Sequence, residues 1–188
     1  TWKVTIIKNP KRPDLPSQKM HIDICRYDSL DKVQRPAKNF YDINSPIEGL
    51  PIPVQSSKEI LADKLVALAF REGRIKPRDV WDLAWLSQQN VPIEASLVKK
   101  KLVMRGKTQK GFLKNLQIHS GSILALDETK LDFEREMLRF VPKDIRERTL
   151  NRKEFWPYVG ETIASQIETI GSALNRNSTN GHDSDMKM

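Results

Sequence analysis

Proline is distributed very unevenly along this chain, and that distribution limits the folds the chain can adopt. Nine of the eleven prolines lie at or before Pro92, and the other two are Pro142 and Pro157. Because proline lacks a backbone N–H and interrupts helices, the first part should be extended and rich in loops, and the later part mostly helical. We therefore expect an α+β protein with a strand-rich segment at residues 1–55, a helical domain at residues 56–174 and a disordered polar tail at residues 175–188.

Two short segments near the start of the chain have the pattern of β-strands. Trp2–Ile7 is rich in β-branched residues, and Met20–Cys25 alternates apolar and polar side chains. This alternation predicts one apolar and one polar face, which favours antiparallel pairing of the two strands. Residues 28–53 show little periodicity and are predicted to be a long connection, with Ile52 and Val54 in a brief edge strand.

The helical part begins at a recognisable signal. Ser56 and Glu59 have the spacing of a capping box, in which serine and a glutamate three residues later cap the helix start. The run from Glu59 to Phe70 is apolar almost all round, so this helix should be central and buried. Pro77 suits the first turn of a second helix that reaches about Asn90. Further helices are expected near residues 92–103, 112–118, 130–140 and 155–174.

Composition excludes several classes of protein. The single cysteine, Cys25, excludes a disulfide scaffold and a multi-cysteine zinc site, and the three histidines are scattered. The mean hydropathy is −0.55, and no apolar run approaches the ~18 residues of a transmembrane helix. These features predict a cytoplasmic protein. The chain starts at Thr1 with no methionine before Met20 and no signal-peptide pattern, so we expect it to begin inside a longer protein.

Two basic residues interrupt the leucine-rich face of the first predicted helix. Lys64 and Arg71 share that face with leucines at positions 61, 65 and 68, because residues three, four and seven apart lie together. An unpaired buried charge costs several kcal/mol or more, so the two cations need an explanation. They either reach the surface or pair with carboxylates, or they line a crevice and hold an anion such as a phosphate.

The next predicted helix supplies two acids. Asp79 and Asp82 are three residues apart and share a helix face. Acids near a helix N-terminus are favoured by the helix dipole, so a purely structural Lys64–Asp82 or Arg71–Asp79 pair would give the same pattern. The combination is more informative, because one stretch of nineteen residues holds Lys64, Arg71, Arg78, Asp79 and Asp82.

Two sequence motifs follow each other along these helices. The first is Ser57-Lys58-Glu59-Ile60-Leu61-Ala62-Asp63-Lys64-Leu65-Val66-Ala67-Leu68, followed by Arg71, and the second is Arg78-Asp79-Val80-Trp81-Asp82-Leu83. In this order they resemble the nucleotidyltransferase AbiEii/AbiGii toxin family, and the resemblance spans about Met20 to Leu86.

The resemblance implies a polymerase-β-like fold, represented here by a partial nucleotidyltransferase-type mixed sheet followed by a helical bundle. It also implies transfer of a nucleotide from an NTP with Mg²⁺, which neutralises charge on the phosphates. Lys64 would contact the triphosphate, with Arg71 and Arg78 completing the nucleotide site. Asp79 would position or activate the attacking group, with Asp82 beside it as a further catalytic acid. Asp23, on the second predicted strand, matches a metal-binding acid of the family.

By the same resemblance, RNA or tRNA is a reasonable acceptor, and the protein would act as the toxin of a toxin–antitoxin pair with a cognate antitoxin as partner. The sequence departs from the family in one respect, because no Gly-Ser loop and Asp-x-Asp strand precede Asp23. Gly121-Ser122 and Asp132-Phe133-Glu134 have a similar spacing but follow the helices, and the second segment reads as a helix. We therefore expect this chain to be a fragment that lacks the full active site.

A basic run follows the second motif. From Lys99 to Lys114 the chain has seven basic residues and no acid, and its net charge of +8 favours polyanionic partners. The predicted nucleic-acid-binding residues are Lys99, Lys100, Lys101, Arg105, Lys107 and Lys110. A solvated surface would give the same pattern. Two alternative functions stay open, namely a non-catalytic basic helical module that binds nucleic acid, and a degenerate relative whose charged helices only stabilise the fold.

Overall fold

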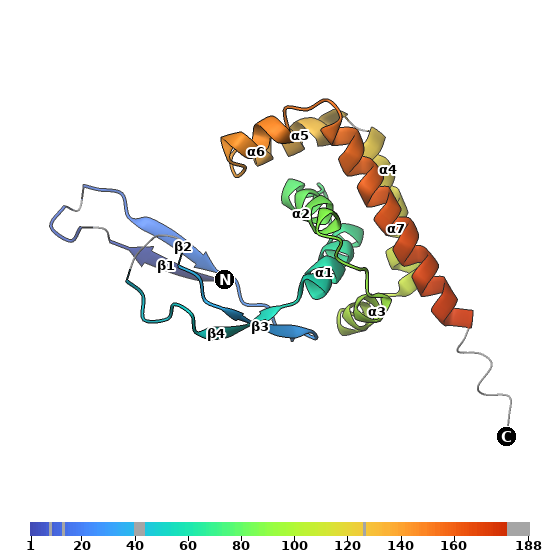
Figure 1. Cartoon of the computed structure of the whole chain (residues 1–188), viewed down its shortest axis with the longest axis horizontal. Coiled ribbons are helices and arrows are strands. Elements are labelled where there is room, and N and C mark those ends of the chain that lie inside the picture. Colours follow the sequence, from blue (N-terminus) through green and yellow to red (C-terminus); the bar gives the residue numbers. More distant parts are fainter. Residues whose placement is uncertain (8, 13, 40–43, 126, 180–188) are drawn as a thin grey trace, which may run out of the picture.

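The computed structural model describes residues 1–7, 9–12, 14–39, 44–125 and 127–179. Within these residues, four short strands come first and seven helices follow, which confirms the α+β class (Figure 1). The strands form two separate antiparallel pairs. The described elements follow the predicted order, with extended segments first and helices after them.

The first strand pair matches the predicted one, with a shift at its end. β1 (Trp2–Ile6) pairs with β2 (Gln18–Ile22), and its register places Trp2 opposite Ile22 and Val4 opposite Met20. The apolar side chains of this ladder are exposed, Trp2 by 65%. β2 ends at Ile22, which pairs with Trp2, so Asp23 lies just beyond the strand and not on it.

The second strand pair was only half predicted. β4 (Pro51–Gln55) contains Ile52 and Val54 as expected, but it pairs with β3 (Lys32–Pro36) in the segment expected to be a plain connection. β3 carries a single strongly apolar residue, Val33, so it lacks the alternation that marks a strand. Its pairing depends on Val54 across the ladder, which is a tertiary contact.

The helix α1 (Ser57–Ala69) starts at the predicted cap. Ser56 Oγ accepts a hydrogen bond from the Glu59 N–H at 3.1 Å, which is half of a capping box. The other half is absent, because the Glu59 carboxylate accepts from the Ser29 hydroxyl and from the N–H groups of Leu30 and Asp31. Glu59 therefore ties the start of α1 to the segment that leads into β3.

The remaining helices follow the predicted order with different ends. They are α2 (Pro77–Gln88), α3 (Ala95–Met104), α4 (Gln109–Ala125), α5 (Asp127–Met137), α6 (Lys143–Arg148) and α7 (Phe155–Thr179). Pro77 occupies the first turn of α2, as predicted. α6 was not predicted, since it has six residues and no buried position. α7 extends past the expected end at residue 174, and residues 180–188 of the predicted tail lie outside the described residues.

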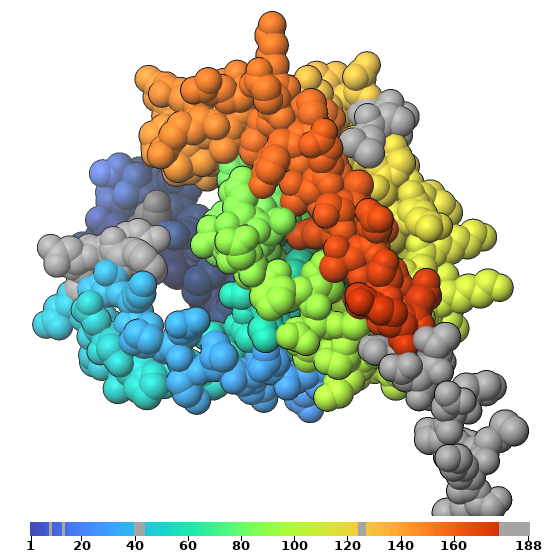
Figure 2. Space-filling model, turned by 45° about the vertical axis from the view of Figure 1, so that its right-hand side comes forward, coloured from blue at the N-terminus to red at the C-terminus, as the bar shows by residue number. Residues whose placement is uncertain are grey.

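The core of the protein is helical. α1 packs against α2, α3 and α4, and α7 packs against α2, α3 and α4. Leu65, Leu83, Phe112 and Ile163 are all fully buried between these helices. Figure 2 shows α7 in red beside α4 in yellow, with the blue and cyan strands on the opposite side of the molecule. None of the described helices is both long enough and apolar enough to span a membrane.

Candidate active site

The side chain of Lys64 lies between the two acids of α2. Its ammonium nitrogen is 2.9 Å from Asp79 Oδ1 and 2.6 Å from Asp82 Oδ2. Arg71 donates from Nη2 to the other oxygen of Asp79. The structure thus brings together four of the residues that the motifs single out, and we call Lys64, Arg71, Asp79 and Asp82 the Lys64 cluster.

Local helix geometry explains why these four residues meet. Lys64 and Arg71 are seven apart, close to two turns, although Arg71 lies just past the end of α1. Asp79 and Asp82 are three apart on α2 and share the face that packs toward α1. Asp79 does not cap α2, because its carboxylate is bound to Lys64 and Arg71.

The cluster keeps its members charged. Burial alone would lower the pKa of Lys64, but hydrogen bonds to Asp82 and Asp79 and the charges of both raise that pKa above its ordinary value. Burial would raise the pKa of Asp79, whereas Lys64 and Arg71 hold it below the ordinary value. Lys64 and Asp79 are therefore ionised at neutral pH. The Lys64 side chain remains 25% exposed, so a ligand can reach it.

Arg78 stands apart from the cluster. Its Nε is 3.1 Å from Glu136 Oε1 on α5, and its guanidinium lies 4.9 Å from the centre of the Phe140 ring. Neighbouring residues of a helix point about 100° apart, so Arg78 turns away from the face that carries Asp79. Arg78 therefore makes its described contacts away from Lys64 and Arg71, and its part in nucleotide binding stays a prediction.

Asp23 does not approach the cluster through any described contact. Its carboxylate accepts a hydrogen bond from the Thr1 hydroxyl and is exposed. Because β2 ends at Ile22, the predicted placement of this acid on a strand is wrong. Its role as a metal ligand stays a prediction.

The described residues hold no preassembled cluster of metal-ligating side chains. Among them, no group of three metal-ligating side chains converges. The Asp79 and Asp82 carboxylates are bound to cations, and Asp23 has no second acid beside it in the contacts described. The segment with the Asp-x-Asp-like spacing does not supply a strand motif either, since Asp132 and Glu134 lie on α5. The prediction that this segment is helical is confirmed.

The basic run contains one residue that is not a surface residue. Lys101 is only 1% exposed, and its ammonium contacts Glu59 and lies 3.0 Å from Asp63 Oδ2. Arg105, one turn later, pairs with the other oxygen of Asp63 at 2.7 Å and covers the Tyr27 ring. Lys101 therefore cannot contact a nucleic acid. To bind a phosphate its ammonium would have to leave the interior, and the buried Glu59 carboxylate would then lack a cation.

The other predicted residues of the run are accessible to different degrees. Lys100, Lys107 and Lys110 are exposed, and Lys99 is partly buried. The Lys107 ammonium lies 5.0 Å from the centre of the Phe70 ring, a cation–π contact that leaves it at the surface. The run is thus divided between a structural part at Lys101 and Arg105 and a surface part.

Sequence reasoning missed the interior acid that holds this region together. Glu59 is fully buried on α1. Its carboxylate accepts hydrogen bonds from the groups at residues 29–31 and from Lys101, and its backbone N–H donates to Ser56 Oγ. A signal was available, because Lys101 shares a helix face with Leu97 and Val98 and therefore needs a buried acid as partner.

Comparison with known proteins extends the motif evidence. The family model described as "Nucleotidyl transferase AbiEii toxin, Type IV TA system" matches residues 2–161. This range reaches beyond the Met20–Leu86 stretch on which the resemblance rested and includes both strand pairs and the start of α7. Comparisons with curated proteins and with solved structures give no significant match. Because the matched range covers most of the chain, this protein belongs to the nucleotidyl transferase AbiEii toxin family of type IV toxin–antitoxin systems.

Proposed function

We propose that the protein transfers a nucleotide from an NTP to an acceptor, and that the Lys64 cluster forms the helical side of the active site. The observation that carries this proposal is the position of the Lys64 ammonium between both acids of the Arg-Asp-x-x-Asp motif. Family membership supports the reaction class and implies a nucleotide substrate and an antitoxin partner.

Lys64 is suited to hold a phosphate oxygen. An ammonium group has three N–H donors, and in the described contacts Asp79 and Asp82 take two of them. The third is left for an anion. Because the two acids already hold the ammonium in place, binding a phosphate would cost little further side-chain freedom.

Asp79 is suited to orient the attacking group. Its lowered pKa makes it a weak base, so early removal of a proton is not its best role. Each of its oxygens has a second lone pair beyond those used by Lys64 and Arg71. An attacking hydroxyl would donate a hydrogen bond to one of them. Asp82, with a 40% exposed side chain, would help to keep Lys64 directed at the substrate.

We further propose RNA, including tRNA, as the acceptor. The net charge of +8 and the exposed lysines of the basic run, Lys100, Lys107 and Lys110, support this assignment. The family's Gly-Ser loop and Asp-x-Asp strand are not found ahead of Asp23. Family membership supports an NTP and a divalent metal as the cofactors of the proposed reaction. The protein would act in the cytoplasm as a toxin restrained by its antitoxin.

The test measures transfer of labelled nucleotide from each NTP to RNA by the full-length protein. Lys64→Met should weaken NTP binding and lower transfer, because it removes the charge while keeping much of the side-chain volume. The matched control is Lys58→Met, also on α1, whose ammonium forms a surface pair with Glu94 at 3.0 Å. A folded Lys64→Met protein with normal transfer would overturn the proposal. RNA binding that depends steeply on salt, without NTP binding, would instead favour the non-catalytic binding module.

A further inference from the structure

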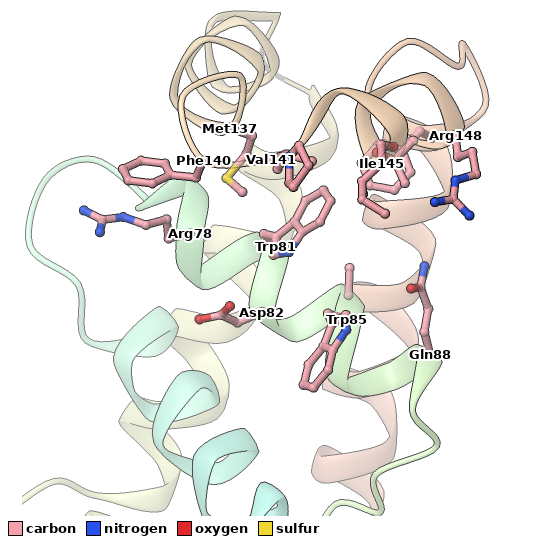
Figure 3. A pocket seen from close by; sticks show the side chains of 14 residues that line it. Arg78, Trp81, Asp82, Trp85, Gln88, Met137, Phe140, Val141, Ile145 and Arg148 are labelled. Carbon is pink, nitrogen blue, oxygen red and sulfur yellow. The ribbon is translucent and has the colours of Figure 1, made fainter. Parts of the chain in front are cut away.

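A cavity of about 630 Å³ lies on the side of α2 that faces away from α1. Figure 3 shows it between α2 and the chain segment from Met137 through α6. Its volume falls within the range of roughly 300–1,000 Å³ that is typical of small-molecule sites. The proposed role of the Lys64 cluster does not account for this cavity.

Aromatic rings line this cavity to different depths. Trp81 forms its inner wall and is held by the rings of Phe133 at 6.4 Å and Phe155 at 5.9 Å. Trp85 and Phe140 also line it, and they are 49% and 54% exposed. Two large aromatic side chains therefore offer ring surface to a ligand without being needed for the core.

Polar groups occur mainly at the rim. Figure 3 shows Gln88 and Arg148 at one side of the opening and Arg78 with Phe140 at the other. The amide of Gln88 can both donate and accept hydrogen bonds. Arg78 and Arg148 place guanidinium groups at this rim, where they pair with Glu136 and Asp144. Flat apolar walls with an amide and cations at the edge suit a planar heterocycle attached to phosphate.

The cavity and the Lys64 cluster share one residue. Asp82 lines the cavity and is 2.6 Å from the Lys64 ammonium. Figure 3 shows Trp81 pointing toward α6 and Asp82, the next residue, pointing toward α1. Asp82 therefore borders both the Lys64 cluster and the aromatic cavity.

We propose that this cavity binds one unpaired nucleobase, an inference that rests on the proposed nucleotidyl transfer. Stacking on aromatic rings accepts any base, because every base has a π-face. The base can belong to the incoming NTP or to an unpaired end of the acceptor RNA. A flexible apolar segment of a protein partner is a different occupant, which the experiment distinguishes.

The experiment compares ligands that differ only in the base. Dissociation constants of the full-length protein are measured for NTPs and for inorganic tripolyphosphate, and for a short single-stranded RNA with and without a base at its 3′ end. The base should strengthen binding by roughly 5- to 100-fold in one of the two pairs, as expected for one stacked base. Trp85→Ala and Phe140→Ala should abolish that gain.

Matched controls are Trp2→Ala and Leu138→Ala, which remove exposed apolar side chains outside the cavity. If the cavity variants lose the base-dependent increase in affinity only for NTP, the cavity binds the base of the incoming nucleotide. If they lose it only for RNA, the cavity binds a base of the acceptor. No gain from the base, or an equal gain in the cavity variants and the wild type, overturns the inference and leaves the cavity to an apolar protein segment.

A second measurement does not depend on the folding of any variant. Adenosine should quench the tryptophan fluorescence of the wild-type protein, since Trp81 and Trp85 line the cavity, and no quenching by any nucleoside would count against the inference. Failure of the proposed function is distinguishable. If tripolyphosphate and NTP both fail to bind, nucleotidyl transfer at Lys64 is wrong, while a base-dependent RNA affinity that needs Trp85 would still support the cavity.

Discussion

Lys101 and Glu59 form an ion pair in the protein interior, where the two side chains are 2% and 0% exposed. The same ammonium lies 3.0 Å from Asp63, and the Glu59 carboxylate accepts hydrogen bonds from Ser29–Asp31. Buried charges lose their hydration, so they persist only where each has close partners. This network ties α3 to α1, and both to the segment before β3.

Removing the cation should destabilise the fold strongly. Lys101→Met leaves the Glu59 charge buried without its cation, and we expect the free energy of unfolding to fall by about 3–5 kcal/mol. Lys100→Met, its exposed neighbour, should change it by less than about 0.5 kcal/mol. Urea denaturation of both variants checks this prediction. Equal stability of the two variants would show that the interior pair contributes little.

Acid should weaken the fold through Glu59. Burial alone would raise the pKa of Glu59, but Lys101, Ser29 and two backbone N–H groups lower it from 4.5 to about 2. Below pH 4.5 the unfolded chain takes up a proton that the folded chain does not, so stability falls from pH 4.5 toward pH 2. The total is about 3 kcal/mol, of which roughly 2 kcal/mol is lost by pH 3.

The variant Glu59→Gln isolates this effect from that of the other carboxylates. Its unfolding free energy should change by roughly 2 kcal/mol less between pH 6 and pH 3 than that of the wild type, because position 59 no longer titrates. Urea denaturation at the two pH values measures the difference. Parallel pH profiles of the two proteins would contradict the prediction.

Asp79→Asn separates a catalytic role from a structural one. The amide keeps the shape but removes the charge between Lys64 and Arg71, which should cost about 1–3 kcal/mol of stability. If Asp79 orients the attacking group, nucleotide transfer by the full-length protein should fall roughly 10²–10⁴-fold while the protein remains folded. Circular dichroism and transfer assays provide the two readouts. Glu94→Gln, in the surface pair with Lys58, is the control, and a folded Asp79→Asn protein with control-level transfer would restrict Asp79 to a structural role.

The surface part of the basic run should control RNA binding without sequence preference. Changing Lys100, Lys107 and Lys110 to alanine removes three exposed charges and should lower affinity similarly for unrelated RNAs. The slope of log affinity against log salt should decrease by about 2, close to 0.7 for each lost phosphate contact to single strands. The control changes three exposed lysines elsewhere, Lys3, Lys19 and Lys143, and an equal effect of both triple variants would mean that binding follows net charge only.

The part of the site that could be predicted depends on short spacings. Lys64, Asp79 and Asp82 lie on two consecutive helices whose start signals, Ser56 and Pro77, are both in place. Residues a few positions apart on one helix share a face whatever the rest of the fold does. The sequence therefore identified the members of the Lys64 cluster, and the structure decided that the two cations pair with the two acids.

The structure differs from the expectations where the direction of a side chain, or its partner, depends on a segment far along the chain. Arg78 adjoins Asp79 in the motif but pairs with Glu136 on α5, which sequence spacing cannot indicate. Asp23 alternates correctly with its neighbours, yet β2 ends at Ile22, one residue before it. In both cases the outcome depended on another element.

By itself, the sequence determined the α+β class and the buried helix α1, and it placed Lys64, Asp79 and Asp82 on two adjoining helices, because proline positions, capping residues and helical periodicity act over a few residues. Only the tertiary structure decided that Lys101 belongs to the interior. Its partner Glu59 is 42 residues away, and the apolar neighbours of Lys101 on α3 do not indicate which acid it meets. The pairing of β3 with β4 and the cavity beside Trp81 were decided in the same way, since both arise only when distant segments pack together.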